Sequence, residues 1–170
     1  RPVPPLSKAE IHPLEFAGES SEAKRLRMAE ALRAEGQQAF ILTRPDSLAW
    51  LLNLRGADVA HTPLTLGFAV LHTTGTVDLF IAPEKISPEV QAHLGNAVTL
   101  HPLTQFAPAI ATLAEGARLV ADGSATAHAV FALAKDRIER SADPCQLAKA
   151  QKNPVELAGA RNAQVLVFLL

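Results

Sequence analysis

The stretch DSLAWLLNLRGADVAHTP, Asp46–Pro63, decides how the rest of the chain is interpreted. It starts as an amphipathic turn around Trp50, the only tryptophan, and then becomes a polar segment with Arg55, Asp58 and His61. An apolar base followed by a short charged loop is a common way for a rigid scaffold to present side chains. We expect Trp50 to be a buried structural anchor and the three polar residues to face outward, where they could pair with each other or with a neighbouring domain.

Upstream of this stretch, the pattern predicts one helix and one buried strand. Ser20 or Ser21 can cap a helix that runs to about Glu35, with Gly36 as its terminator. Its charged residues, Lys24 and Arg25 included, are expected to form a solvated face. The apolar run 39–43 then suits a strand buried on both sides, and the proline at position 45 ends it.

Downstream, the pattern predicts a hairpin followed by alternating helices and strands. Residues 67–72 and 76–82 are rich in β-formers, and Gly75 between them can take the positive φ of a tight turn. Helices are expected over 88–94, 103–113 and 125–134, and strands over 97–101, 117–121 and 137–140. This order predicts an α/β fold with a mixed β-sheet and helices on both faces.

The two ends are predicted to differ from the central domain at residues 20–150. Residues 1–19 are proline-rich and suit an extended lead-in or linker. A loop-like stretch over 142–153 leads to Asn153-Pro154-Val155-Glu156, a strong helix start with a capping box. We therefore expect 151–170 to begin a connector helix toward a further domain, with the apolar run 165–170 covered by a partner.

Composition excludes several classes of function. The net charge is −1, with 16 basic and 17 acidic residues, so the basic patch that nucleic acid or an anionic membrane requires is not expected. The longest apolar run is far shorter than the ~20 residues of a membrane span. Cys145 is the single cysteine, which excludes an internal disulfide and favours a reducing, cytoplasmic setting.

No motif in the chain predicts catalysis or a metal site. The six histidines lack the spacing of known zinc motifs, and neither a P-loop nor a GxGxxG sequence occurs. Ser124 lies in DGSATAH, which lacks the GxSxG elbow, so a turn or a helix cap is its expected role. An independent small α/β enzyme would need an acid–base constellation that the sequence does not offer.

Two motifs resemble one known family. DSLAWLLNLRGADVAHTPL, which begins at Asp46, is similar to a phrase in the middle domain of three-domain Xaa-Pro aminopeptidases of the creatinase/prolidase superfamily. KAQKNPVELAGARNA, which begins at Lys149, resembles the segment that leads into their catalytic domain. The family continues with a polar helix where this chain has VLVFLL. The resemblance implies a creatinase N-terminal domain with a ribonuclease-H-like mixed sheet.

The resemblance also implies what the parent protein does. Family members remove the first residue from peptides with proline second, using two divalent metal ions, usually manganese. Two Asp, one His and two Glu of a C-terminal domain hold these ions, and none of those ligand motifs occurs here. The chain alone is therefore expected to be an inactive, non-catalytic domain without a cofactor.

In that family the non-catalytic domains help to form a homodimer and wall the active-site entrance, which admits short proline-containing peptides. The resemblance would place Arg55, Asp58 and His61 at this wall, beside the catalytic domain of the same parent chain. The alternative is a non-enzymatic protein-interaction module of the same fold. Metal ligands after Leu170, in the family's order, would distinguish the two hypotheses.

Overall fold

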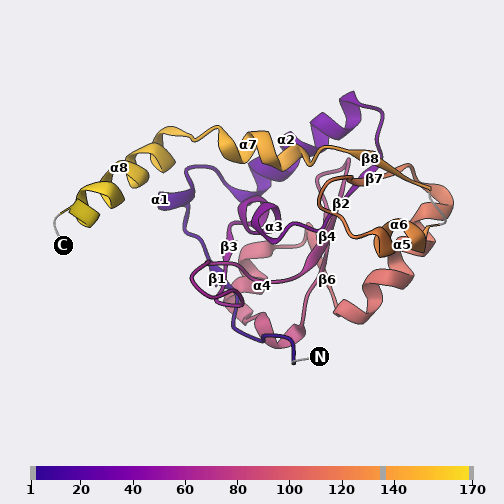
Figure 1. Cartoon of the computed structure of the whole chain (residues 1–170), viewed down its shortest axis with the longest axis horizontal. Helices are drawn as coiled ribbons and strands as arrows, with labels where there is room; N and C mark the ends of the chain where they lie inside the picture. The colour runs from indigo at the N-terminus through magenta and orange to yellow at the C-terminus, as the bar shows by residue number, and fades with distance from the viewer. Residues whose placement is uncertain (1–2, 135–136, 169–170) are drawn as a thin grey trace.

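The computed structural model describes residues 3–134 and 137–168. Its centre is a six-stranded sheet in the order β6-β5-β4-β2-β7-β8 (Figure 1). Strand β4 is antiparallel to both neighbours, and the remaining pairs are parallel. The strands are β2 Ala39–Leu42, β4 Phe68–His72, β5 Val77–Phe80, β6 Val98–His101, β7 Leu119–Asp122 and β8 Ile138–Ser141. The predicted mixed sheet is confirmed.

Helices cover both faces of the sheet, as predicted. Alternation along β2 shows how: Phe40 and Leu42 pack in one core cluster, and Ala39 and Ile41 in the other. The first cluster lies under α2 Ser21–Ala34, α3 Pro45–Leu52, α4 Pro88–Leu94 and α7 Pro144–Ala150. The second lies under α5 Phe106–Gly116 and α6 His128–Leu133. The short 3-10 helices are η1 Pro83–Lys85 and η2 Leu103–Gln105.

Several helix and turn boundaries are formed by the capping and turn residues that the sequence predicted. The Ser20 hydroxyl accepts a hydrogen bond from the Ala23 amide at 3.1 Å and caps α2, and Ser87 caps α4 in the same way. Gly75 has φ of 80°, and a Cβ at this position would lie 2.8 Å from Leu26 Cδ2. The β4–β5 turn therefore favours glycine for its conformation, whereas the exposed end of Leu26 can move to make space for a Cβ.

The expected extended lead-in contains folded elements instead. β1 Glu10–Ile11 pairs antiparallel with β3 Leu54–Arg55 in a separate two-stranded sheet, and the one-turn helix α1 Leu14–Ala17 follows. Ala9 and Ala17 are 4% and 1% exposed. Prolines favoured a linker, but the partner strand lies far along the chain, so local patterns could not reveal the pairing.

The helical predictions also need three corrections. Lys24 and Arg25 are 1% and 6% exposed, whereas the apolar Leu26 beside them is 48% exposed. Helix α6, which was expected to begin at residue 125, begins at His128. The stretch called loop-like contains α7, whose N-cap Asp143 accepts from the Cys145 amide at 2.8 Å and whose first residue is Pro144. That start has the same chemistry as the Asn153-Pro154 start and was detectable from sequence.

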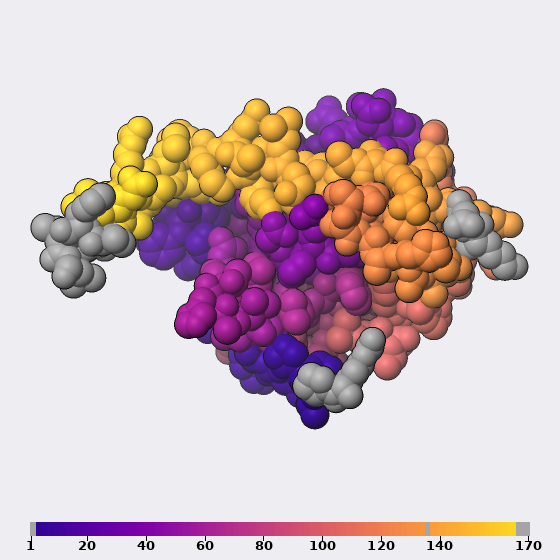
Figure 2. Space-filling model, viewed as in Figure 1, coloured from indigo at the N-terminus to yellow at the C-terminus, as the bar shows by residue number. Residues whose placement is uncertain are grey.

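The last helix, α8 Pro154–Phe168, projects beyond the body of the domain (Figures 1 and 2). Val165 is 59% exposed, and the side chains that follow it lie outside the described residues, as does the prediction that a partner covers them. Within the described part of the chain, no helix combines the length and apolarity needed to cross a bilayer.

Candidate functional site

The stretch Asp46–Pro63 is anchored through Trp50. The indole is 6% exposed and packs in the core cluster below α3. On its other side, the Lys24 ammonium lies 4.7 Å from the ring centroid and the Arg27 guanidinium 5.6 Å. These are cation–π distances, so α2 contributes charge as well as apolar surface to the anchor.

Lys24 is the charged residue most deeply involved in this anchor. Its ammonium donates to the Trp50 carbonyl at 3.1 Å and to Asn53 Oδ1 at 2.7 Å. Burial, above all, lowers the pKa of Lys24 to about 8. The solvated face expected for α2 is wrong at this position because the carbonyl oxygens at the end of α3 satisfy a buried ammonium.

Asn53 connects the Lys24 ammonium of α2 to the end of α3. It ends α3 in the left-handed conformation, with φ of 50°, which asparagine tolerates better than most residues. Its amide group donates to the Glu19 carbonyl at 2.9 Å while its carbonyl accepts from Lys24. The side chain therefore joins the end of α3 to the start of α2.

Arg55 lies at the edge of the same region. Its guanidinium is part-buried and donates to the Leu54 carbonyl at 2.8 Å. Burial lowers its pKa, and the nearby Glu156 carboxylate acts in the opposite direction. Within residues 3–134 and 137–168 no carboxylate comes within ion-pair distance of Arg55.

Asp58 does not face outward, and this part of the expectation is wrong. Its side chain is 0% exposed and pairs with the 2% exposed Lys85. It also accepts from the Ser7 hydroxyl at 2.6 Å and the Leu66 amide at 2.7 Å. Burial alone would raise the pKa of Asp58, but these donors outweigh it and lower the pKa. Asp58 therefore holds the N-terminal segment, its own loop and Lys85 together.

His61 is exposed and has φ of 60° in the turn that the Val59–Thr62 bridge closes. No hydrogen bond or ion pair joins Arg55, Asp58 and His61 to one another in the described structure. His61 is thus exposed, Arg55 is half-buried with its guanidinium on the Leu54 carbonyl, and Asp58 belongs to the interior.

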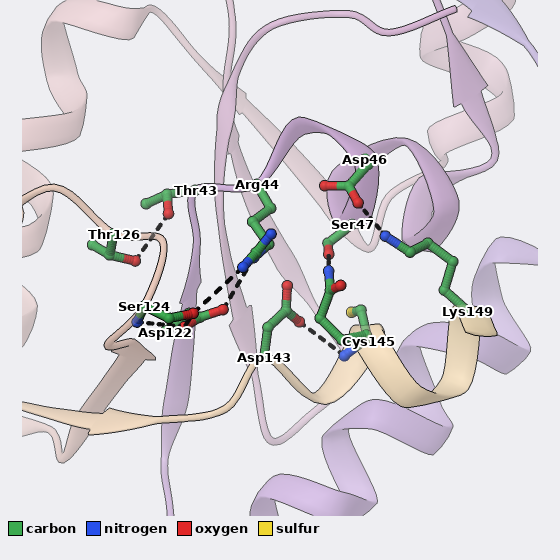
Figure 3. Close-up of polar contacts among 11 residues, drawn as sticks. Thr43, Arg44, Asp46, Ser47, Asp122, Ser124, Thr126, Asp143, Cys145 and Lys149 are labelled. Atoms are coloured by element: carbon green, nitrogen blue, oxygen red, sulfur yellow. Dashed lines mark hydrogen bonds and ion pairs between the residues drawn. The ribbon is translucent and has the colours of Figure 1, made fainter. Parts of the chain in front are cut away.

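A second polar group lies at the carboxyl ends of β2 and β7, an edge where ligands often bind in open α/β sheets (Figure 3). Arg44 Nε lies 3.0 Å from Asp122 Oδ2, and the Ser124 hydroxyl donates to Asp122 Oδ1 at 2.6 Å. Burial alone would raise the pKa of Asp122, but the hydrogen bonds from Ser124 and Arg44 outweigh burial, and the pKa is lowered overall. The Asp122 carboxylate is ionised and already hydrogen-bonded, so it is a poor base for Ser124. We conclude that Arg44, Asp122 and Ser124 hold the ends of β2 and β7 together, which agrees with the turn predicted at Ser124.

The two motif segments meet between α3 and α7 (Figure 3). Lys149 forms an ion pair with Asp46, and Gln146 Nε2 donates to the Ser47 hydroxyl at 2.8 Å. Below them, Cys145 is fully buried, and burial raises the pKa of its thiol. Residues from both motifs therefore bind each other directly, which their separation in the sequence did not reveal.

The start of α8 is tied to the same region. The Asn153 side chain accepts from the Glu156 amide at 2.9 Å, and Glu156 accepts from the Asn153 amide at 3.0 Å, which is the predicted capping box. The Asn153 amide group also donates to the Ala17 carbonyl at 2.8 Å. The direction of the projecting helix is therefore determined by contacts with α1.

No group of three or more His, Cys, Asp or Glu side chains in the described ranges is arranged to hold a metal ion. The polar residues around α3 are engaged with one another and with backbone, and they contain no nucleophile paired with a base. The fold and this arrangement define an α/β domain whose buried polar side chains join its own segments to one another.

Comparison with known proteins agrees with this class. The chain matches the Creatinase/Prolidase N-terminal domain family over residues 1–156, and it belongs to that family. The resemblance seen in the two motifs is thereby confirmed.

Two curated relatives illustrate the relationship. The chain is 36% identical to a protein named probable Xaa-Pro aminopeptidase P from Talaromyces marneffei, over 97% of this chain and 26% of that protein. It is 34% identical to a protein of the same name from Aspergillus niger, over 97% of this chain and 28% of that one. The chain thus spans about a quarter of the length of these relatives.

Solved structures share the fold. An X-prolyl aminopeptidase from Caenorhabditis elegans, described as a cytosolic enzyme with a di-nuclear active site, superimposes with a TM-score of 0.87 at 24% identity. The match covers 95% of this chain and 28% of that protein. An Xaa-Pro dipeptidase from Bacillus anthracis gives a TM-score of 0.63 at 13% identity, over 82% and 38% of the two chains.

Proposed function

We propose that this chain is the non-catalytic domain of an Xaa-Pro aminopeptidase and that it positions and walls the active site of a catalytic domain in the same parent chain. The observation that carries the proposal is that the two family motifs bind each other through Asp46–Lys149, while Asn153 of the second motif ties the start of α8 to α1. The contact with α1 and the capping box determine where α8 leaves the domain, which is what a positioning domain requires.

The parent enzyme would act on short peptides with proline second and use two divalent metal ions, with manganese as the expected metal, held by its catalytic domain. The names of the relatives and the di-nuclear site of the worm enzyme support this assignment. The domain described here would contribute neither metal ligands nor a nucleophile. We further propose that the parent works as a cytoplasmic homodimer, and gel filtration of the parent would test its assembly.

Arg55 and His61 are the residues of this chain proposed for the entrance wall. Arg55 carries a guanidinium that lacks a carboxylate partner among the described residues, and this suits recognition of a peptide carboxylate or of an acidic group on the neighbouring domain. His61 extends the same segment and is exposed. Asp58 supports the wall from inside through Lys85.

The test uses the parent protein in which a catalytic domain follows this one. Arg55→Ala is expected to raise KM, or to change the preferred peptide length, while the protein stays folded. Arg33→Ala, which removes an exposed guanidinium from α2, serves as the matched control. Unchanged kinetics for Arg55→Ala, with unchanged stability, would remove Arg55 from the entrance.

A separate experiment tests the non-catalytic assignment. The 170-residue chain, incubated with manganese and an Xaa-Pro peptide, is expected to release no amino acid and to retain no stoichiometric metal after desalting. Turnover by this chain that depends on its own residues would overturn the proposal in favour of an independent enzyme.

A further inference from the structure

A hollow of about 400 Å³ opens between helix α5 and the strands β5 and β6. Sites for small molecules usually enclose roughly 300 to 1,000 Å³. Its apolar wall comes from α5, through Pro108, Ala109 and Leu113, with the buried Phe80 of β5 at the base. Helix α3 packs on the other face of the sheet, so the hollow is separate from the proposed entrance wall.

Asp78 supplies the negative charge of this hollow. Its side chain is 27% exposed and lies between two imidazoles: His72 Nε2 is 2.7 Å from Oδ2, and His101 Nε2 is 2.9 Å from Oδ1. Burial alone would raise the pKa of Asp78, but the hydrogen bonds from His101 and His72 outweigh burial, and the pKa is lowered overall. The carboxylate is therefore ionised at neutral pH.

The partners of Asp78 differ from those of the other paired carboxylates. Within the described part of the chain, each of the others that forms an ion pair has a lysine or an arginine as its partner. Asp78 has His72 and His101 instead, and an imidazole cancels a carboxylate charge only when it is protonated. With these histidines neutral, the negative charge of Asp78 is not compensated.

The carboxylate also has room for a further donor. An ionised carboxylate offers about four lone-pair sites, and the two imidazoles take one site on each oxygen. Helix α5 brings no charged side chain to the hollow, and His101 is the titratable residue that lines it from β6. A cation that enters therefore meets the charge of Asp78 and no lysine or arginine.

The chemistry of these groups selects an organic cation. An ammonium group donates three hydrogen bonds and can approach a carboxylate that already has other donors. The apolar side chains of α5 give a short alkyl chain a surface on which to pack. A metal ion is not indicated, because no set of three suitable side chains in the described ranges is arranged around one point.

We propose that this hollow binds a small primary alkylammonium, with its ammonium group on Asp78 and its alkyl chain against Pro108, Ala109 and Leu113. The site lies on the domain itself and is independent of any catalytic domain. It would give the domain a ligand site on the α5 face of the sheet, in addition to its positioning role.

The test is an NMR titration of the 170-residue chain with isopentylamine, which is protonated at neutral pH, and with isopentanol, a neutral compound of nearly the same shape. The amine is expected to shift the Leu113 methyl signals and the His101 ring signals. Isopentanol should bind about fivefold more weakly, or less tightly still, because it carries no charge. Equal binding of the two compounds, or no shift of these signals by the amine, would overturn the proposal.

Two variants make the test specific. Asp78→Asn keeps the shape of the side chain and removes its charge, so it should weaken binding of the amine about fivefold and leave binding of isopentanol unchanged. Glu30→Gln is the matched control, since it removes an exposed carboxylate from α2 on the other face of the sheet. It should leave binding of the amine unchanged, which separates the local charge from the net charge.

Circular dichroism shows whether Asp78→Asn is folded. A folded Asp78→Asn protein that binds the amine as tightly as the wild type would contradict the proposal. If the variant fails to fold, the comparison of amine and alcohol decides, because it uses the wild-type chain.

Discussion

Replacing Asp58 by Asn should destabilise the domain far more than its place in a loop suggests. The substitution leaves the Lys85 ammonium, 2% exposed, without a negative partner in the interior. Removing one partner of a buried ion pair costs about 3 to 5 kcal/mol. For a protein of this size, that loss lowers the melting temperature by roughly 6 to 20 °C, at about 2 to 4 °C per kcal/mol. Urea and thermal denaturation followed by circular dichroism measure it.

Two comparisons show whether the buried charge is the cause. The double variant Asp58→Asn with Lys85→Met removes both charges and should recover part of the loss, because no unpaired ammonium remains. Glu139→Gln removes a carboxylate from the exposed Arg118–Glu139 pair and should hardly change the midpoint. A loss below about 1 kcal/mol for Asp58→Asn would refute the reasoning, since the median for surface pairs is that small.

The same pair predicts a pH dependence. The pKa of Asp58 is lower in the folded protein than in the unfolded chain, where it is about 3.9. The folded state therefore gains stability above that unfolded value and loses it as the pH falls through the folded pKa. Denaturation between pH 6 and about pH 2 should show a steeper acid loss for the wild type than for Asp58→Asn.

Three further predictions concern the anchor and the outgoing helix. Trp50→Ala should lower the free energy of unfolding by about 3 to 5 kcal/mol, measured in urea, because the ring is 6% exposed; a loss below 1 kcal/mol would contradict its anchoring role. Lys24 has a pKa of about 8 in the folded protein, so above that pH the folded state binds fewer protons than the unfolded chain. The free energy of unfolding should therefore rise from about pH 8 toward pH 10, and Lys24→Met should abolish this rise. Asn153→Ala should cost about 1 kcal/mol and speed amide exchange in the first turn of α8; unchanged exchange would show that the cap does not hold this helix.

Local patterns predicted most elements of the domain. The β4–β5 hairpin, the capped starts of α2, α4 and α8, and the buried strand β2 all lie where short-range chemistry put them. Proline at the first turn, serine or asparagine at the cap and glycine at positive φ act within a few residues, so they can be read without knowledge of the fold. The missed helix α7 had the same type of start.

The site was less predictable than the fold because its partners are distant in sequence. Charge and a loop position indicated an exposed Asp58, but the carboxylate pairs with Lys85 and Ser7 from two other segments. Lys24 resembled a solvated residue until the end of α3 supplied two oxygen acceptors. Burial of a charge is decided by whether partners converge on it, and a linear pattern does not contain that information.

For Asp46–Pro63, the sequence alone determined the helix after Pro45, the role of the apolar residues around Trp50 and the family resemblance. Only the tertiary structure decided the surroundings of the polar residues: His61 is exposed, Arg55 is half-buried and donates to backbone carbonyls, Asp58 becomes interior, and Asp46 binds Lys149 of α7. The reason is physical. Helix and turn formation depend on neighbours along the chain, whereas the environment of a charge depends on the segments that fold against it.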